Sequence, residues 1–306
     1  MLVLSGDQIE LAADLLKKGE LVAFPTETVY GLGAPIFNEK AIAKIFQAKG
    51  RPANNPLIAH IADLSQVDQI ARDIPPDFYR LAAEFFPGPL TIVLKKHPDV
   101  PAMVSGGLGT IALRMPSHPL ARRLILAVGE PLVAPSANLS GTPSSTTARH
   151  VIADFQGKIA AVIDGGETEF GIESTVIYLA SDTPCLLRPG ALSPEAIEKV
   201  LGKPLQKASS ENRLTSPGMQ YRHYSPQAKI RLFTNREEME NYRLSEGRRL
   251  CLSTQEEPGF YHLKASNLYA LLRLADEENY PEIVIFCDET RDLAFLDRLQ
   301  RASLCK

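Results

Sequence analysis

Strand-like apolar runs alternate with amphipathic helical segments along residues 7–201, and this alternation limits the chain to an α/β fold. The first helical segment places Ile9, Ala12 and Leu16 on one face and ends at Gly19. Some neighbouring strands have no helix between them, so the sequence predicts one mixed, twisted sheet rather than an all-parallel one. The predicted helices are 7–18, 39–48, 77–86, 119–128, 146–155 and 194–201, the last capped by Ser193, and the predicted strands are 21–24, 57–61, 90–94, 110–115, 132–134, 159–163, 174–179 and 185–188.

The composition changes after residue 205, and the length of 306 residues suggests two domains. We predict an α/β domain over 1–205, a linker over 206–228, and a small α/β, Rossmann-like domain over 229–306. The small domain has predicted strands at 230–233, 249–252 and 283–287 and helices at 237–242, 266–276 and 293–302, and it shows no cluster that we interpret as a functional site.

The linker contains the segment SPGMQYRHYSP (216–226), which has more aromatic and basic residues than a flexible spacer needs. One interpretation is that its tyrosines only anchor the linker to a domain surface. The other is that this ordered segment takes part in a site.

The overall charge, the cysteine spacing and the lack of long apolar runs argue against several classes of partner and site. With a net charge of −3, the chain has no general basic field for a nucleic acid, so a small polyanion held by local cations fits better. The four cysteines are far apart and form no CxxC pair, which argues against a zinc site. Neither a signal peptide nor an apolar run of membrane-spanning length is present, so we expect a cytoplasmic protein without membrane contact.

The segment FPTETVYGLG (24–33) places two threonines, a glutamate and a tyrosine just after a buried strand. Polar side chains at a strand end often face a ligand. The structural alternative is a polar turn with a helix cap at Thr26 or Thr28.

Three further polar clusters follow, each with its own structural alternative. KGRPANNP (49–56) brings two cations after a helix, with His60 in the next strand, although a basic residue there can simply complement the helix dipole. The glycine loop at 106–109 opens onto Thr110 and Arg114 and can approach a phosphate. APSANLSG (134–141), with Ser144 after it, is polar beyond a strand but also resembles a common turn.

Several catalytic motifs are absent from the sequence. It contains no GxxxxGK[ST] phosphate loop, no Ser-His-Asp arrangement with an elbow motif, and no HExxH. This pattern favours a reaction in which substrates attack each other while the protein supplies position and charge.

Taken together, the clusters above, with PGPLTIVL (87–94), IALRMPSHP, GGETEFGIESTV and LLRPG, resemble the YrdC family over residues 5–205. The linker and the small domain, including AFLDRLQRA (294–302), are similar to the longer, two-domain form of that family. The resemblance implies an enzyme that joins L-threonine, bicarbonate and ATP, with Mg²⁺ bound to the ATP, into threonylcarbamoyl-adenylate with release of pyrophosphate. A separate transferase complex would pass the threonylcarbamoyl group to tRNA.

The resemblance also implies roles for individual residues, with no metal ligand among the side chains. The expected L-threonine contacts are Thr28, His60, Arg114, Ala134 and Ser174, and the expected ATP contacts are Lys49, Arg51, Asn55, Thr110, Ser136, Asn138, Ser144, Arg188 and Tyr221. Arg114 suits the amino-acid carboxylate, and Lys49 and Arg51 suit the phosphates. Tyr221, His223 and Tyr224 would form a lid that excludes water.

Two other functions fit parts of this pattern. One is an RNA-binding or ribosome-maturation module, because the domain could hold an RNA helix on a locally basic face. The acidic net charge argues against tight direct nucleic-acid binding. The other is a carbamoyl-transfer enzyme of hydrogenase maturation, which contains a related domain, but the expected preceding segments are not found in this sequence.

Overall fold

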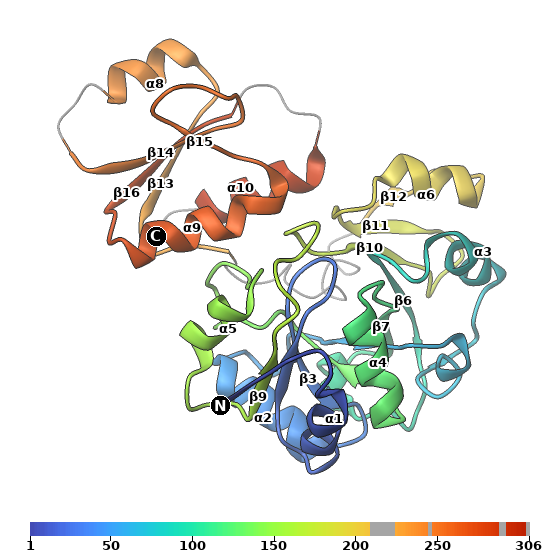
Figure 1. Cartoon of the computed structure of the whole chain (residues 1–306). Coiled ribbons are helices and arrows are strands. Elements are labelled where there is room, and N and C mark those ends of the chain that lie inside the picture. The colour runs from blue at the N-terminus through green and yellow to red at the C-terminus, as the bar shows by residue number, and fades with distance from the viewer. Residues whose placement is uncertain (209–223, 244–246, 288–291, 304–306) are drawn as a thin grey trace.

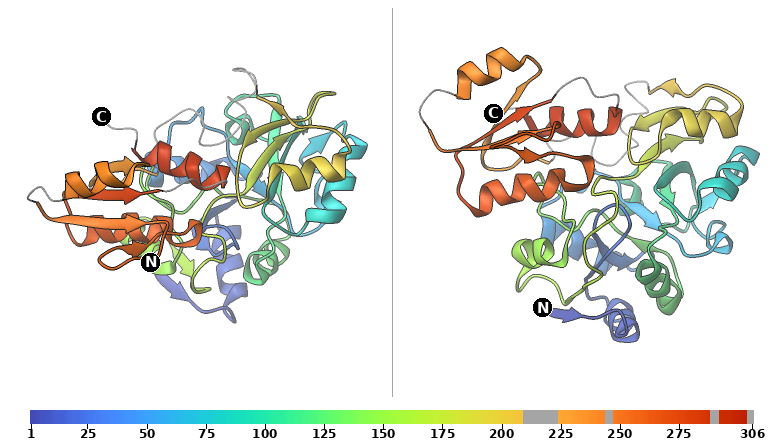
Figure 2. Two further views of the ribbon diagram at one scale, coloured as in Figure 1. Left: turned by 90° about the horizontal axis from the view of Figure 1, so that it is seen from above. Right: turned by 45° about the horizontal axis from the view of Figure 1, so that its top comes forward.

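A computed structural model describes residues 1–208, 224–243, 247–287 and 292–303, which form two α/β domains (Figures 1 and 2). The larger domain is built on a sheet with strand order β1-β9-β2-β3-β8-β4-β7-β6-β10-β11-β12, and β5 pairs with β6. Its strands are β1 (Leu2–Leu4), β2 (Val22–Phe24), β3 (Gly31–Pro35), β4 (Ile58–His60), β5 (Ala71–Arg72), β6 (Leu90–Lys96), β7 (Thr110–Arg114), β8 (Leu132–Val133), β9 (Ala161–Ile163), β10 (Thr175–Tyr178), β11 (Cys185–Arg188) and β12 (Gln206–Lys207).

The large sheet is mixed, as the sequence predicts. Strands β4 and β7 pair in parallel, whereas β3 runs antiparallel to both β2 and β8. Six α-helices accompany these strands within the described residues: α1 (Ile9–Lys17), α2 (Glu39–Lys49), α3 (Pro76–Phe85), α4 (Pro119–Val128), α5 (Ala148–Phe155) and α6 (Pro194–Leu201). The predicted Ser193 cap of α6 is confirmed, because its side chain accepts a hydrogen bond from the Ala196 N–H.

The two faces of the large sheet carry separate hydrophobic cores. Successive side chains of a strand point to opposite faces, and in β2 Val22 and Phe24 pack with α1 and α4 while Ala23 packs on the other side. The second face is covered by apolar residues of α2, α3, α5 and α6. The sheet is therefore buried on both sides, which holds the loops at its strand ends in fixed positions.

The predicted elements of this domain all occur, but the short strands β1, β3, β5 and β12 were not predicted. Strand β3 has the sequence GLGAP, and glycine and proline are both unfavourable in strands. The glycine has a packing reason, because a Cβ on Gly33 would lie 2.9 Å from the Phe24 ring. The segment after Phe24 therefore crosses back into the sheet, where the sequence suggested only a turn.

The smaller domain is a parallel sheet with strand order β13-β16-β14-β15. Its elements are β13 (Lys229–Phe233), α8 (Arg236–Arg243), β14 (Arg249–Ser253), β15 (Tyr261–His262), α9 (Leu268–Glu277), β16 (Glu282–Phe286) and α10 (Leu293–Ser303). Helix α8 packs on one face through Met239, and α9 and α10 pack on the other through Leu272 and Leu299. Strand β15 was not predicted, since it contains only two residues.

Helices α9 and α10 lie on the side of the small domain that faces the larger one (Figure 1). The interface includes an apolar contact, because Val29 of the larger domain and Tyr224 of the linker belong to the core of the small domain. The Tyr224 ring stacks on Tyr269 with a centroid separation of 5.2 Å. Of the predicted lid, Tyr221 and His223 lie outside the described residues, and only Tyr224 can be placed.

Candidate active site

A cavity with an empty volume of about 650 Å³, partly open to solvent, lies over the central strands of the large sheet. The cavity brings together residues that are far apart in the sequence. The five residues predicted to contact L-threonine all line it, namely Thr28, His60, Arg114, Ala134 and Ser174, and so do Arg51, Ser136, Asn138 and Arg188 of the predicted ATP set, with Tyr224 of the predicted lid.

Among the described residues of the predicted ATP set, four do not line this cavity. Asn55 and Ser144 are buried behind it, where the Asn55 carbonyl accepts a hydrogen bond from Arg51 and the Ser144 hydroxyl donates to Glu173. Thr110 begins β7 opposite Lys95, at the other end of the strand from Arg114. The glycine loop at 106–109 is also outside the lining.

Lys49 is the fourth of these residues, and its side chain is directed to backbone carbonyls. The last turn of α2 carries it beneath the segment after β8, where its ammonium donates to the carbonyls of Ser136, at 2.6 Å, and Asn138. Burial, followed by the charge of Arg51, lowers the Lys49 pKa well below its ordinary value. In this structure the amine therefore supports the Ser136–Asn138 wall from behind.

Arg114 is held at the cavity by two residues of the segment after β2. Its Nη1 donates to the Thr28 hydroxyl at 2.8 Å, and its Nη2 lies 2.7 Å from Glu27 Oε1 in a buried ion pair. The N–H groups of Arg114 do not point at the Glu27 carboxylate, so the ion pair is not also a hydrogen bond. Within the described residues, neither Glu27 oxygen nor Arg114 Nε has a hydrogen-bond partner. Arg114 therefore keeps unused donor capacity beside the cavity.

Thr26 and Tyr30 have structural roles in the same segment. The Thr26 hydroxyl accepts hydrogen bonds from the N–H groups of Thr28 and Val29, which makes the turn, and no helix begins here. The Tyr30 hydroxyl donates to the Gly166 carbonyl at 2.8 Å, and burial raises the pKa of Tyr30 to about 12. Thr26 therefore forms the polar turn of the structural alternative, but the helix cap that this alternative also included is not present.

His60 is a neutral side chain beside Arg114. Strands β4 and β7 pair His60 with Arg114 in register. Burial, and then the Arg114 charge, lowers the pKa of His60 to about 3. Its Nδ1 lies 3.2 Å from the Ile58 carbonyl, and a carbonyl can only accept, so Nδ1 carries the proton and Nε2 is left as an acceptor.

Ser174 and Arg188 form the opposite wall. Arg188 donates from Nε and Nη2 to the Ser174 carbonyl, at 3.2 and 2.9 Å, and the Ser174 hydroxyl lies 2.7 Å from the Thr91 hydroxyl. Gly190 allows this approach, because a Cβ there would lie 2.2 Å from the Thr175 nitrogen. The lining thus contains three guanidinium groups, of Arg51, Arg114 and Arg188, and one carboxylate, of Glu173. This excess of positive charge favours anionic ligands.

Glu173 connects the cavity to the small domain. Its Oε1 accepts from the Ser144 hydroxyl at 2.6 Å, and its Oε2 accepts from Arg298 Nε of α10 at 2.8 Å and from the Tyr269 hydroxyl of α9 at 2.9 Å. Arg298 also donates to the Pro189 carbonyl at 3.0 Å, and its side chain is fully buried. Tyr269, Arg273 and Arg298 of the small domain therefore reach the larger domain, a contribution that the sequence did not indicate.

A pattern in the sequence could have indicated Arg298. It lies three residues after Phe295 and four before Ala302, on the buried face of α10. An arginine on the apolar face of a helix requires an anionic partner. The partner could not be identified from the sequence because Glu173 lies in the other domain.

The ionisation of Glu173 should make the protein sensitive to acid. Burial alone would raise its pKa, but the charges of Arg298 and Arg188 and the hydrogen bonds outweigh burial and lower it to about 2. A carboxyl with a lowered folded-state pKa stabilises the fold above its unfolded pKa, and this contribution is lost as pH falls towards the folded pKa. Between pH 6 and pH 3 the unfolding free energy of the unmodified chain should fall by about 2 kcal/mol more than that of Glu173→Gln in urea titrations. Equal losses would contradict an ionised Glu173.

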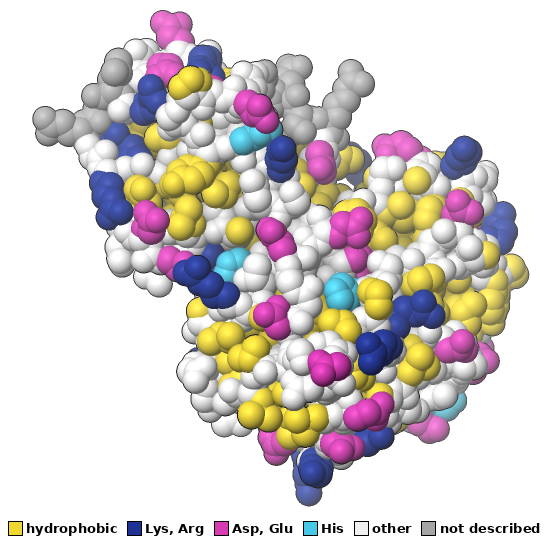
Figure 3. Space-filling view, in the orientation of Figure 1, with side chains coloured by type: hydrophobic (Ala, Val, Ile, Leu, Met, Phe, Trp, Pro, Cys, Tyr) yellow, Lys and Arg dark blue, Asp and Glu magenta, His cyan; other side chains and the backbone are white. Residues whose placement is uncertain are grey.

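The described parts of the chain contain no group of three or more His, Cys, Asp or Glu side chains placed to hold a metal ion, and none of their helices is long and apolar enough to span a bilayer. On the face shown in Figure 3, basic and acidic side chains are interspersed and form no continuous basic surface.

Comparison with known protein families extends over both domains. The Sua5/YciO/YrdC family model, described as telomere recombination, matches residues 14–190. The family model of the threonylcarbamoyl-AMP synthase C-terminal domain matches residues 192–303.

Individual relatives and solved structures agree with these matches. A threonylcarbamoyl-AMP synthase of Bacillus subtilis is 44% identical over 97% of this chain and 93% of its own length. A threonylcarbamoyl-AMP synthase of Pyrococcus abyssi is 53% identical over 73% of this chain and 67% of its own length. The crystal structure of P. abyssi Sua5 complexed with L-threonine superposes with a TM-score of 0.91 at 41% identity, and covers 99% of this chain and 98% of that one.

Proposed function

Because the chain belongs to the Sua5/YrdC family of threonylcarbamoyl-AMP synthases, we propose that it joins L-threonine, bicarbonate and ATP into threonylcarbamoyl-AMP and releases pyrophosphate. The observation that carries this proposal is that one cavity holds all five predicted threonine residues beside Arg51 and Arg188 of the predicted ATP set.

In the proposed complex, L-threonine occupies the end of the cavity formed by Thr28, His60 and Arg114. Its carboxylate takes the free donors of Arg114, since a guanidinium fork matches a carboxylate. Nε2 of the neutral His60 accepts a hydrogen bond from the substrate ammonium or hydroxyl group. Ser174 and Ala134 complete the walls around the amino acid. The P. abyssi relative was crystallised with L-threonine, which supports L-threonine as a ligand of this chain.

The nucleotide occupies the end of the cavity lined by Arg51, Ser136, Asn138 and Arg188. Arg51 is fixed there by hydrogen bonds to the carbonyls of Asn55, at 3.3 Å, and Pro56, at 2.8 Å. Mg²⁺ enters with ATP on phosphate oxygens, because it prefers oxygen ligands and keeps several waters. The arginine charges neutralise the negative charge that builds up as pyrophosphate leaves.

The reaction needs no covalent bond to the protein. The deprotonated threonine amine combines with bicarbonate, with loss of water, or with CO₂, with loss of a proton, to give a carbamate. A carbamate oxygen then attacks the α-phosphorus of ATP and displaces pyrophosphate. Holding both substrates in one cavity makes this attack effectively intramolecular. Tyr224, buried at the cavity, excludes water from a product that hydrolyses readily. A tRNA threonylcarbamoyl transferase complex in the cytoplasm consumes this product.

The direct test is to incubate the protein with ATP, Mg²⁺, bicarbonate and L-threonine and to detect threonylcarbamoyl-AMP by mass spectrometry. We expect equal amounts of adenylate and pyrophosphate, and neither product when threonine or bicarbonate is omitted. Pyrophosphate release that does not depend on threonine would contradict the proposal.

Arg51→Ala should weaken ATP binding by about 2 kcal/mol, since a hydrogen bond to a charged group is worth roughly that much. Titration calorimetry with a non-hydrolysable ATP analogue measures this loss, and threonine binding in the same protein serves as the internal control. Unchanged nucleotide affinity would place the phosphates away from Arg51.

A further inference from the structure

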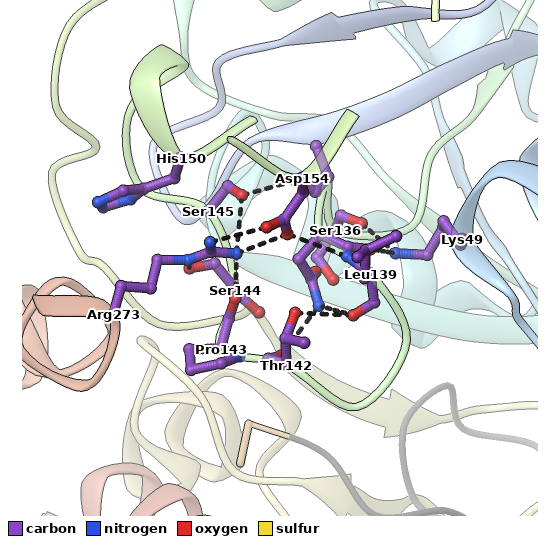
Figure 4. A network of polar contacts seen from close by, with 12 residues as sticks. Lys49, Ser136, Leu139, Thr142, Pro143, Ser144, Ser145, His150, Asp154 and Arg273 are labelled. Atoms are coloured by element: carbon purple, nitrogen blue, oxygen red, sulfur yellow. Dashed lines mark hydrogen bonds and ion pairs between the residues drawn. The ribbon is translucent and has the colours of Figure 1, made fainter. Parts of the chain in front are cut away.

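Arg273 of α9 crosses from the small domain into the larger one, and Figure 4 shows its contacts. Its guanidinium pairs with both oxygens of Asp154 on α5, from Nη1 to Oδ1 at 3.0 Å and from Nη2 to Oδ2 at 2.8 Å. The two side chains are 9% and 11% exposed. The opposite charges of this buried, bidentate pair largely offset each other, so the hydrogen-bond contacts of Arg273 are its main route to the cavity.

The same guanidinium holds the loop that follows β8, residues 136–145, which we call the 136–145 loop. Its Nη2 donates to the Pro143 carbonyl at 2.6 Å and to the Ser145 hydroxyl at 3.3 Å, and its Nε donates to the Ser144 carbonyl at 3.4 Å. Arg273 therefore fixes the C-terminal half of this loop through backbone acceptors.

Asp154 fixes the N-terminal half of the 136–145 loop. Its Oδ2 accepts a hydrogen bond from the Leu139 N–H at 3.0 Å, next to Asn138. On the opposite side of the loop, the Lys49 carbonyl accepts from the Ser140 N–H at 2.9 Å, and the Lys49 ammonium bonds the Ser136 carbonyl (Figure 4). The 136–145 loop is thus held between α2 and the Asp154–Arg273 pair.

We propose that Arg273 is a positioning residue for the nucleotide end of the cavity. Through Asp154 and the carbonyls of Pro143 and Ser144, it fixes the loop on which Ser136 and Asn138 face the nucleotide. The small domain is then a working part of the site in the larger domain. This inference rests on the proposed function for the identity of the ligand, but its structural basis does not.

The test compares Arg273→Lys and Asp154→Asn with Glu277→Gln in the full-length chain. Lysine keeps the charge but cannot span both Asp154 oxygens and the loop carbonyls, and asparagine removes the acceptor pair. Glu277→Gln breaks the exposed pair between Glu277 of α9 and Arg149 of the larger domain, so it is the matched control for an interdomain contact.

Hydrogen–deuterium exchange without ligands gives the first readout. We expect the amides of the 136–145 loop, above all Leu139, to exchange about tenfold faster in Arg273→Lys and Asp154→Asn, with the central strands unchanged. Glu277→Gln should leave the loop unchanged. Unaltered loop exchange in both Arg273→Lys and Asp154→Asn would overturn the inference, whatever the activity of the protein.

Steady-state kinetics gives the second readout. We expect the KM for ATP to rise about tenfold in Arg273→Lys, while the KM for threonine stays within about twofold, because within the described residues no hydrogen bond joins Thr28, His60 or Arg114 to the loop. An equal rise in both constants would indicate general loosening and overturn the positioning role. If the unmodified protein made no adenylate, the proposed function would fail, and loop exchange would still decide the structural inference.

Discussion

Arg114→Ala is expected to lower kcat/KM for threonine on the order of a thousandfold while leaving ATP affinity within about threefold. In the proposed complex, the change removes two charge-assisted hydrogen bonds to the substrate carboxylate. Each is worth about 2 kcal/mol, and every 1.4 kcal/mol corresponds to a factor of about ten. Pyrophosphate release at varied threonine concentration measures the loss, and titration with an ATP analogue measures the retained binding.

The buried partner of Arg114 requires its own control, because Glu27 would be left as an unpaired buried charge. The double variant Arg114→Ala with Glu27→Gln removes that charge and should recover stability without recovering activity. Arg123→Ala, on the exposed side of α4, should behave like the unmodified protein. Normal turnover in Arg114→Ala would show that another group binds the carboxylate.

Arg298→Leu is expected to lower the free energy of unfolding by about 3–5 kcal/mol, because it leaves the buried Glu173 carboxylate without its main counter-charge. Urea unfolding measures this loss. Adenylate formation should fall as well, since Glu173 precedes Ser174 in the cavity wall and its Oε1 holds Ser144.

A double-mutant cycle that combines Arg298→Leu with Glu173→Gln separates the energy of the Arg298–Glu173 interaction from the general effect of a core substitution. Because the two side chains are in direct contact, the double variant should be less destabilised than the sum of the single variants by more than about 1 kcal/mol. Lys44→Gln, which breaks the exposed pair with Glu20, should change stability by no more than about 0.5 kcal/mol. Additive losses at Arg298 and Glu173 would contradict a coupled pair.

The regular part of the fold follows from local patterns in the sequence. Helices such as Pro119–Val128 and Pro194–Leu201 have the predicted bounds, because proline opens them, glycine follows their ends and apolar residues repeat at helical spacing. Strand β3 could not be predicted in this way, because its glycines are explained by tertiary neighbours, the Phe24 ring beside both and the Ala134 side chain beside Gly31.

The sequence predicted most residues of the cavity wall, but not the directions of their side chains or the contacts that hold them. The resemblance indicates Thr28, His60 and Arg114, and pairing of β4 with β7 brings the last two together. The direction of the Lys49 side chain could not be predicted, because it depends on carbonyls of a distant loop. The contributions of Arg273 and Arg298 depend on how two domains pack, which local periodicity does not encode.

The most direct test of the central claim is exchange of radiolabelled pyrophosphate into ATP. If both substrates react with each other in one cavity, label should enter ATP only when threonine and bicarbonate are both present, because the reverse reaction requires threonylcarbamoyl-AMP. Exchange with ATP and Mg²⁺ alone would reveal an adenylylated protein and would contradict the account.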